Sequence, residues 1–326
     1  MARISRWTPG TGSIFLCKMK LPDHQRLRGL VAATHTPFHA DGSLNLAAVE
    51  MQCAHLHANN VTSVFIGGTT GESSSLSLDE RRSLAQRWMD VTRGTPMRVI
   101  VHVGSNALAD ARVLAADAEQ LGAPAIAALA PSYFKPRSLD ALIACAADIA
   151  AAAPATPFYF YDIPSMTGVS FSMCDFLAQA AARIPTLAGL KFTNPDLLSY
   201  QLCLHADGGA WDVPFGCDEF LLAALSLGAT GAVGSTYNFA APIYHRLMRA
   251  FAAGDIATAR MEQFRSVELV QLLAGAGFMG AAKAVMGMLG VDVGPARLPN
   301  GNPTPGQLFS LRNALETMGF FDWIKN

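Results

Sequence analysis

From residue 29 onward, short apolar runs alternate with longer runs in which apolar and polar residues are mixed. Short runs that are apolar almost throughout predict strands buried on both faces. Longer runs rich in Ala and Leu, with an apolar stripe, predict helices between these strands. The predicted strands cover residues 29–36, 62–67, 98–104, 125–130, 157–163, 187–193, 213–216 and 232–235. The predicted helices between them cover residues 45–58, 78–92, 107–121, 139–152, 172–183, 195–205 and 219–227.

This alternation is typical of repeated βα units that build a parallel sheet. Eight units predict an α/β fold, a (β/α)8 TIM barrel, which takes about 250 residues. A doubly wound open sheet is the alternative, but no GxGxxG motif follows the first strand. Further helices, more than a barrel needs, are predicted at residues 242–252, 256–274, 280–289 and 305–318. We expect a tail or strap at residues 1–28, the barrel at 29–254 and a C-terminal helical extension at 255–326.

Charge and hydropathy narrow the range of partners. The net charge is −1 and no basic stripe is present, so nucleic acid is not an expected partner. The longest apolar stretches, such as residues 144–154, are too short and too rich in Ala to cross a bilayer. The basic N-terminal segment has an apolar patch only at residues 14–17, which is too short for a secretory signal. We expect a soluble, cytoplasmic protein with no membrane partner, and targeting by this segment is the alternative.

Cysteines and histidines give no sign of a metal centre. The cysteines show neither a CxxC pair nor zinc-ligand spacing, so we expect free thiols in a reducing compartment. The histidines form no HExxH motif and no compact cluster, so no metal is expected. The six cysteines are Cys17, Cys53, Cys145, Cys174, Cys203 and Cys217.

Lys191 is the lysine that lies inside an apolar predicted strand, residues 187–193. Burying an ammonium group costs free energy unless a partner or deprotonation compensates. A neutral amine at the end of a barrel strand can attack a carbonyl carbon. The alternative is a structural ion pair, or a lysine that extends its ammonium group to solvent.

Two further strand ends carry candidate groups for the same chemistry. Tyr161 ends an aromatic strand and precedes a turn rich in Pro and Gly, where a phenol can move protons; a core tyrosine is the alternative. The loop at residues 67–72, Gly-Gly-Thr-Thr-Gly-Glu, follows a strand. Its backbone N–H groups, with the hydroxyls of Thr69 and Thr70, suit a carboxylate, although an ordinary βα turn has the same composition.

The last two predicted strands end in polar groups suited to a polyol. Asp218 and Glu219 can bind sugar hydroxyls, and Ser235 adds a donor or acceptor. Helix N-capping by Asp218 is the alternative, and both roles can hold together.

Four segments in this order resemble the dihydrodipicolinate synthase / N-acetylneuraminate lyase superfamily. They are residues 67–72, 161–168, 189–193 and 231–238, and the resemblance runs from about Arg28 to the C-terminus. It implies a (β/α)8 barrel and a class I, Schiff-base aldolase or lyase. It implies no cofactor and no metal, because Lys191 itself forms the covalent imine with a 2-keto acid.

The lyase branch of the superfamily gives the better resemblance. Synthases of this type carry an arginine two residues after the proline of the tyrosine motif, where this chain has Met166. The lyase branch implies cleavage of N-acetylneuraminate to N-acetylmannosamine and pyruvate. Asp162 and Cys217 depart from its pattern. The alternatives are a 2-keto-3-deoxy sugar acid aldolase, a synthase-like or hydroxyproline-derived dehydratase, or a binding protein without activity.

The resemblance also implies roles for individual residues. Tyr161 accepts the proton of the C4 hydroxyl, and Thr69 and Thr70 hold the keto-acid carboxylate. Tyr133 reaches into a neighbouring subunit's site, which fits the homotetramer, a dimer of dimers, of the family. The residues implied to line the sugar end are Thr193, Gly216, Asp218, Glu219, Gly234 and Ser235.

Overall fold

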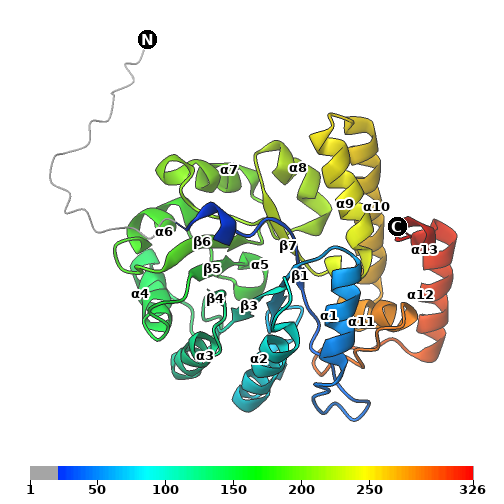
Figure 1. Ribbon diagram of the computed structural model, residues 1–326, viewed down its shortest axis with the longest axis horizontal. Coiled ribbons are helices and arrows are strands. Elements are labelled where there is room, and N and C mark those ends of the chain that lie inside the picture. The colour runs from blue at the N-terminus through cyan, green and yellow to red at the C-terminus, as the bar shows by residue number, and fades with distance from the viewer. Residues whose placement is uncertain (1–20, 326) are drawn as a thin grey trace.

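The computed structural model describes residues 21–325, so most of the predicted N-terminal tail lies outside the described residues. Strands occupy the centre of the molecule and helices surround them (Figure 1). The strands form one parallel sheet in the order β6-β5-β4-β3-β2-β1-β7. Their bounds are β1 Gly29–Ala33, β2 Ser63–Ile66, β3 Arg98–His102, β4 Ala125–Leu129, β5 Phe158–Asp162, β6 Leu187–Phe192 and β7 Gly231–Gly234.

Residues 212–216 join the two ends of this sheet. Phe215 forms parallel bridges with Phe192 of β6 and with Ala232 of β7. The N–H of Gly216 donates to the carbonyl of Phe192 at 2.7 Å. The prediction of a regular strand at 213–216 is wrong, because Pro214 has no N–H for a ladder and the segment makes single bridges instead. The sheet is therefore curled, with this segment spanning the gap between β6 and β7.

Helices follow the strands in sequence, largely where the pattern predicts them. The helix of residues 78–92 is predicted without error, and Ser77 and Glu80 close a capping box at its start. The short helix α5 is unpredicted, and α9 begins before Pro242 because a kink at Ala240 lets the proline fit. Other helices, such as α6 and α8, are shorter than predicted. The bounds are α1 Ala48–Ala58, α2 Leu78–Thr92, α3 Leu108–Gln120, α4 Leu139–Ala150, α5 Pro164–Thr167, α6 Met173–Ala180, α7 Leu197–His205, α8 Leu221–Ser226 and α9 Tyr237–Ala252.

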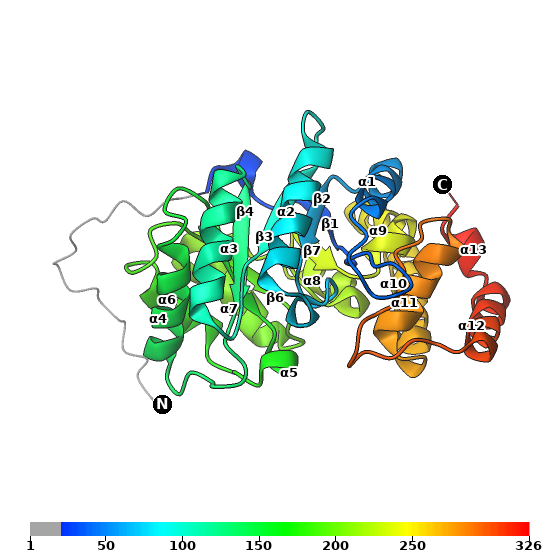
Figure 2. The ribbon, with the colours of Figure 1, turned by 90° about the horizontal axis from the view of Figure 1, so that it is seen from below.

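The predicted C-terminal helices are present as a group on one side of the molecule, next to α1 and α9 (Figure 2). They are α10 Ile256–Gly275, α11 Phe278–Met288 and α12 Pro305–Met318, and a short unpredicted helix, α13 Phe320–Trp323, follows them. Within residues 21–325 no single helix is long and apolar enough to cross a membrane, and only α10 with α11, bent by 115°, passes that test as a pair.

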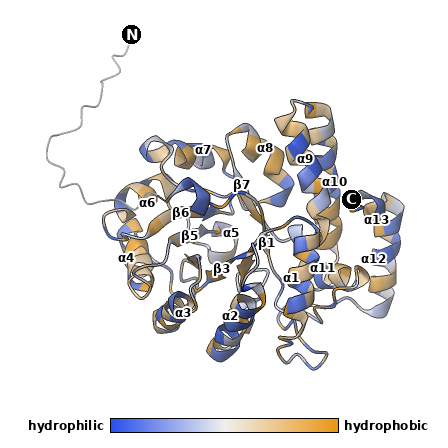
Figure 3. Ribbon diagram, viewed as in Figure 1, coloured by the Kyte–Doolittle hydropathy of each residue, from blue (hydrophilic) through white to orange (hydrophobic). Residues whose placement is uncertain are grey.

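Alternate residues of each strand enter two separate hydrophobic clusters. In β5, Phe158 and Phe160 pack outward against the helices, whereas Tyr159 and Tyr161 belong to an inner cluster. Strands buried on both faces explain the nearly continuous apolar runs. The helices around them mix hydrophilic and hydrophobic residues, as α2 and α3 show in Figure 3.

Residues 21–28 cross the N-terminal ends of the strands. Leu21 and Leu27 are buried in the inner cluster. The N–H of Leu27 donates to Asp212 Oδ2 at 2.7 Å, which also accepts from the hydroxyl of Tyr159 at 2.7 Å. A Cβ at Gly231 would lie 1.9 Å from the carbonyl oxygen of Leu27, so this segment packs directly on the start of β7.

Candidate active site

Lys191 lies near the C-terminal end of β6, with its side chain among the inner residues of the sheet. It is 4% exposed. Its Nζ lies 3.6 Å from the centroid of the Tyr161 ring and 5.1 Å from that of Phe65. It donates a hydrogen bond to Thr193 Oγ1 at 2.9 Å. Among residues 21–325, no ion pair involves Lys191, so a buried amine stands without a carboxylate partner.

The backbone of β6 explains why the lysine is held in this place. Gly189 has a φ of 155°, and a Cβ there would lie 1.8 Å from the carbonyl oxygen of Asp212. Only glycine allows the neighbouring segment to approach so closely. The N–H of Leu190 donates to that same carbonyl at 3.0 Å, which ties the strand together just before Lys191.

Tyr161 connects Lys191 to the loop after β2. Its hydroxyl lies 3.3 Å from Thr69 Oγ1, within hydrogen-bond range. Thr70, the next residue of that loop, is buried. Three predicted residues from separate segments, Lys191, Tyr161 and Thr69, therefore meet at the C-terminal ends of the strands.

The loop at residues 67–72 is fixed from beneath by His102 and Arg81, which sequence reasoning did not single out. His102 Nδ1 lies 2.8 Å from the carbonyl oxygen of Gly67. Arg81 donates to the carbonyls of His102 at 2.8 Å and Gly104 at 2.9 Å. Burial lowers the pKa of His102 to about 3, assisted by Arg81, so the ring is neutral and its Nδ1–H donates to Gly67. The position of His102 at a predicted strand end was the one available signal.

Asp218 marks the opposite side of the site. Its Oδ2 accepts from the N–H of Thr236 at 2.9 Å and from the Thr236 hydroxyl at 2.6 Å. The N-capping alternative is wrong, because Asp218 is inside its short helix and its carboxyl caps no helix. Burial raises the pKa of Asp218 to about 6, despite the Thr236 bonds that lower it. Glu219 beside it is half-buried.

Two glycines leave room for these side chains. A Cβ at Gly234 would lie 1.9 Å from Asp218 Oδ1, and a Cβ at Gly216 would lie 2.0 Å from Thr193 Oγ1. The predicted sugar-end residues thus include two pairs in close approach, Thr193 with Gly216 and Asp218 with Gly234. Ser235 follows Gly234 directly and is half-buried.

Tyr133 does not join these residues within its own chain. Its side chain is 78% exposed, and the ring packs edge-on against Phe134, which is 87% exposed, with centroids 5.0 Å apart. Large aromatic side chains at the surface are typical of residues that contact another subunit.

A cavity of ≈250 Å³ opens beside Thr69 and His102 and reaches Met166, which is 63% exposed. Lys191 and Tyr161 do not line it, so Thr69 is the link between the cavity and the lysine. A larger groove of ≈830 Å³ lies over α2 and α3, where its charged side chains pair with each other, as Arg82 does with Asp117. The candidate catalytic side chains stand at the strand ends and not in this groove.

In the part of the chain that the structure describes, no three His, Cys, Asp or Glu side chains gather closely enough to hold a metal ion. Fold and site together define a parallel α/β protein with an unpaired buried lysine and a tyrosine at the C-terminal ends of its strands. The chain belongs to the dihydrodipicolinate synthetase family, whose model matches residues 26–317. The resemblance inferred from the sequence is confirmed.

Relatives and solved structures place the chain near one branch of the family. It is 42% identical to N-acetylneuraminate lyase of Gallus gallus over 84% of this chain and 91% of that protein. It is 41% identical to N-acetylneuraminate lyase A of Xenopus laevis, with the same coverage. The structure of Proteus mirabilis N-acetylneuraminate lyase matches 90% of this chain and 99% of its own, with 39% identity and a TM-score of 0.88.

Proposed function

We propose that this chain is a carbon–carbon lyase that cleaves N-acetylneuraminate to N-acetylmannosamine and pyruvate through an imine on Lys191. The observation that carries the proposal is the buried amine of Lys191, which has a tyrosine ring and a hydroxyl beside it but no carboxylate. A carboxylate partner would favour the charged ammonium, which cannot attack a ketone. The similarity to N-acetylneuraminate lyases supports the choice of substrate.

The first half of the reaction forms the imine. Lys191 Nζ attacks C2 of the open-chain keto acid, and the nitrogen proton moves to the former ketone oxygen. Tyr161 donates its phenolic proton to the hydroxyl on C2, water leaves, and a protonated imine remains beside a phenolate. The hydrogen bond between Tyr161 and Thr69 stabilises this phenolate.

The second half breaks the carbon bond. The phenolate of Tyr161 takes the C4 hydroxyl proton, the C3–C4 electrons move to the imine nitrogen, and the aldehyde leaves. The resulting enamine takes a proton from Tyr161 at C3. Water then adds to C2 and gives its proton to Tyr161, and the adduct collapses to pyruvate and free Lys191. The lysine supplies the electron sink, so the scheme needs no cofactor beyond the covalent imine.

The remaining residues divide between the two ends of the substrate. Thr69 and Thr70, with the backbone N–H groups of their loop, hold the keto-acid carboxylate. The sugar end lies toward Asp218, whose Oδ1 faces the space kept open by Gly234. The residues proposed for this end are Thr193, Gly216, Asp218, Glu219, Gly234 and Ser235.

The finer features of fold and assembly belong to the same proposal. Residues 212–216 take the place of the eighth strand of a (β/α)8 barrel, and their bridges to β6 and β7 support this assignment. A homotetramer, a dimer of dimers in which Tyr133 enters a neighbour's site, is supported by the exposure of Tyr133 and Phe134. The cytoplasmic location and the division at residues 28 and 254 stay predictions.

Borohydride trapping tests the proposal. We expect pyruvate with borohydride to add one reduced adduct per chain, which mass spectrometry locates at Lys191. Failure to label Lys191 would contradict the imine and favour a binding protein without activity. A substrate panel then separates the branches: pyruvate release from N-acetylneuraminate, above that from 2-keto-3-deoxy sugar acids, supports the lyase, and the reverse order supports a sugar acid aldolase.

A further inference from the structure

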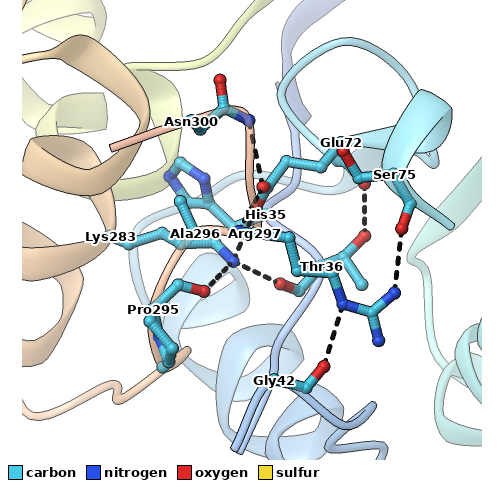
Figure 4. A network of polar contacts seen from close by, with 12 residues as sticks. His35, Thr36, Gly42, Glu72, Ser75, Lys283, Pro295, Ala296, Arg297 and Asn300 are labelled. Carbon is cyan, nitrogen blue, oxygen red and sulfur yellow. Dashed lines mark hydrogen bonds and ion pairs between the residues drawn. The ribbon is translucent and has the colours of Figure 1, made fainter. Parts of the chain in front are cut away.

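The loop that carries Thr69 ends in a buried carboxylate held entirely by the C-terminal extension. Glu72 Oε1 pairs with Lys283 Nζ at 2.8 Å, and both side chains are inaccessible to solvent. Glu72 Oε2 accepts from the N–H of Arg297 at 2.8 Å and from Asn300 Nδ2 at 3.1 Å. Figure 4 shows these groups converging on Glu72 from the C-terminal segment.

This contact reaches the reacting groups through two further bonds. The N–H of Glu72 donates to the carbonyl of Thr69 at 3.0 Å, and the hydroxyl of Thr69 meets Tyr161. Glu72 has a φ of 53°, a left-handed conformation that a non-glycine residue keeps only when its surroundings enforce it. Lys283 is itself fixed, because its Nζ donates to the carbonyls of Thr36 and Pro295 at 2.9 Å each.

The extension makes a second, separate contact at the sugar end. The hydroxyl of Thr236, which donates to Asp218, lies 2.6 Å from the hydroxyl of Tyr244. Tyr244 lies 2.8 Å from Ser266 of α10, and Ser266 donates to the carbonyl oxygen of Asp218 at 3.2 Å. These contacts join Asp218, Thr236, Tyr244 and Ser266 in one buried polar cluster, and Gln263 of α10 also donates to that carbonyl at 3.2 Å.

We propose that the C-terminal extension positions the two ends of the site independently. Lys283 and Glu72 fix the loop that binds the keto-acid carboxylate, and Ser266 with Tyr244 fixes Asp218 for the hydroxyls of the aldehyde. Glu72, Lys283, Tyr244 and Ser266 are positioning residues, because each acts through Thr69 or Asp218. The inference rests on the proposed function, which assigns the two ends.

Two conservative variants separate the two contacts. Glu72→Gln keeps the acceptor for Arg297 and Asn300 but loses the charge opposite Lys283. We expect the pyruvate concentration for half-maximal borohydride trapping to rise roughly 5- to 20-fold, the size of one lost charged contact. The KM for N-acetylmannosamine in condensation, at saturating pyruvate, stays at its wild-type value.

Tyr244→Phe gives the opposite result, because it removes only the hydroxyl between Thr236 and Ser266. The KM for N-acetylmannosamine rises roughly 5- to 20-fold, while the trapping of pyruvate is unchanged. The matched control is Arg312→Gln, which breaks an exposed pair with Glu316 on α12 of the same extension. That variant should change neither constant.

A double variant keeps the inference testable if Glu72→Gln alone folds poorly. Glu72→Gln combined with Lys283→Met removes both charges of the buried pair, and its fold is checked by circular dichroism and melting. If the folded double variant traps pyruvate at wild-type concentrations, or if Glu72→Gln and Tyr244→Phe shift both constants together, the inference is overturned and the proposed function stands. If the wild-type chain traps no pyruvate, the proposed function fails and the inference fails with it.

Discussion

Two lysines are buried among residues 21–325, and the groups around them differ in one respect that decides what each lysine can do. Lys191 and Lys283 are 4% and 2% exposed, and each lies beside an aromatic ring, Tyr161 at 3.6 Å and Phe38 at 4.2 Å. Lys283 has Glu72 at 2.8 Å and two carbonyl acceptors, whereas Lys191 has one hydroxyl. Burial alone therefore does not mark a reactive amine. What distinguishes Lys191 is that no carboxylate in the described part of the chain lies within ion-pair distance of its amine, so no acidic side chain competes with a ketone for it.

The largest expected effect comes from removing the unpaired lysine. Lys191→Met should lower turnover by a factor on the order of 10⁴ or more, because the imine cannot form. Stability should be kept or should rise, since methionine fills a similar volume without a buried amine. Steady-state kinetics and urea unfolding check both parts, with the exposed Lys325→Met as control. A large loss of stability would show that Lys191 is structural, like Lys283.

The aromatic rings beside the two lysines also differ: Tyr161, next to Lys191, has a hydroxyl, and Phe38, next to Lys283, has none. Tyr161→Phe should slow turnover by a factor on the order of 10² to 10⁴, as expected for loss of a general acid/base. The adduct at Lys191 should still form with pyruvate, although more slowly. Single-turnover cleavage measured beside adduct formation checks this. Full activity of the variant would remove the proton-transfer role.

The paired lysine should give the reverse pattern. Lys283→Met leaves the carboxylate of Glu72 buried without its cation, which costs about 3 to 5 kcal/mol of unfolding free energy. Combining it with Glu72→Gln should restore most of that loss, because no unpaired charge remains. Urea unfolding of the single and double variants makes the measurement, and equal stability of the two would contradict the pairing.

The smallest expected effect is on stability and comes from Asp162, a buried carboxyl that, like Lys191, has no oppositely charged partner among the described residues. Asp162 is buried with only Asn194 Nδ2 at 3.2 Å, and burial raises its pKa to about 6. A raised folded-state pKa means stability that is full below the ordinary value near 3.8 and is lost as pH rises through 6.

Asp162→Asn removes that titration. The variant should be about 2 to 3 kcal/mol more stable than wild type at pH 8 and equal to it at pH 3. Unfolding curves across this pH range test the expectation. A difference independent of pH would mean that the carboxyl of Asp162 is not the cause.

The sequence identified Lys191, Tyr161 and Thr69 as candidate site residues because each lies at or just after a strand end. The parallel topology brings these strand ends together. Strand positions followed from runs buried on both faces, and the exception at 213–216 follows from Pro214. The roles assigned to these residues came from the family resemblance and stay proposals.

The partners of buried charges could not be predicted in this way. Glu72 and Lys283 lie far apart in the chain, and a lysine in an amphipathic helix looks like an exposed one. Arg81 and His102 bind backbone carbonyls, which every residue has, so no side-chain pattern marks such contacts. The sequence shows where a side chain stands along its element but not what tertiary packing places opposite it.

Residues 21–28 cover the end of the curled sheet at which the strands begin, because Leu21 and Leu27 pack into the inner cluster there. Lys191 and Tyr161 stand toward the opposite, C-terminal ends of their strands. In the proposed reaction the substrate therefore approaches and leaves past the loops that follow the strands. The aldehyde departs first, since the pyruvate fragment stays bonded to Lys191 until the imine is hydrolysed.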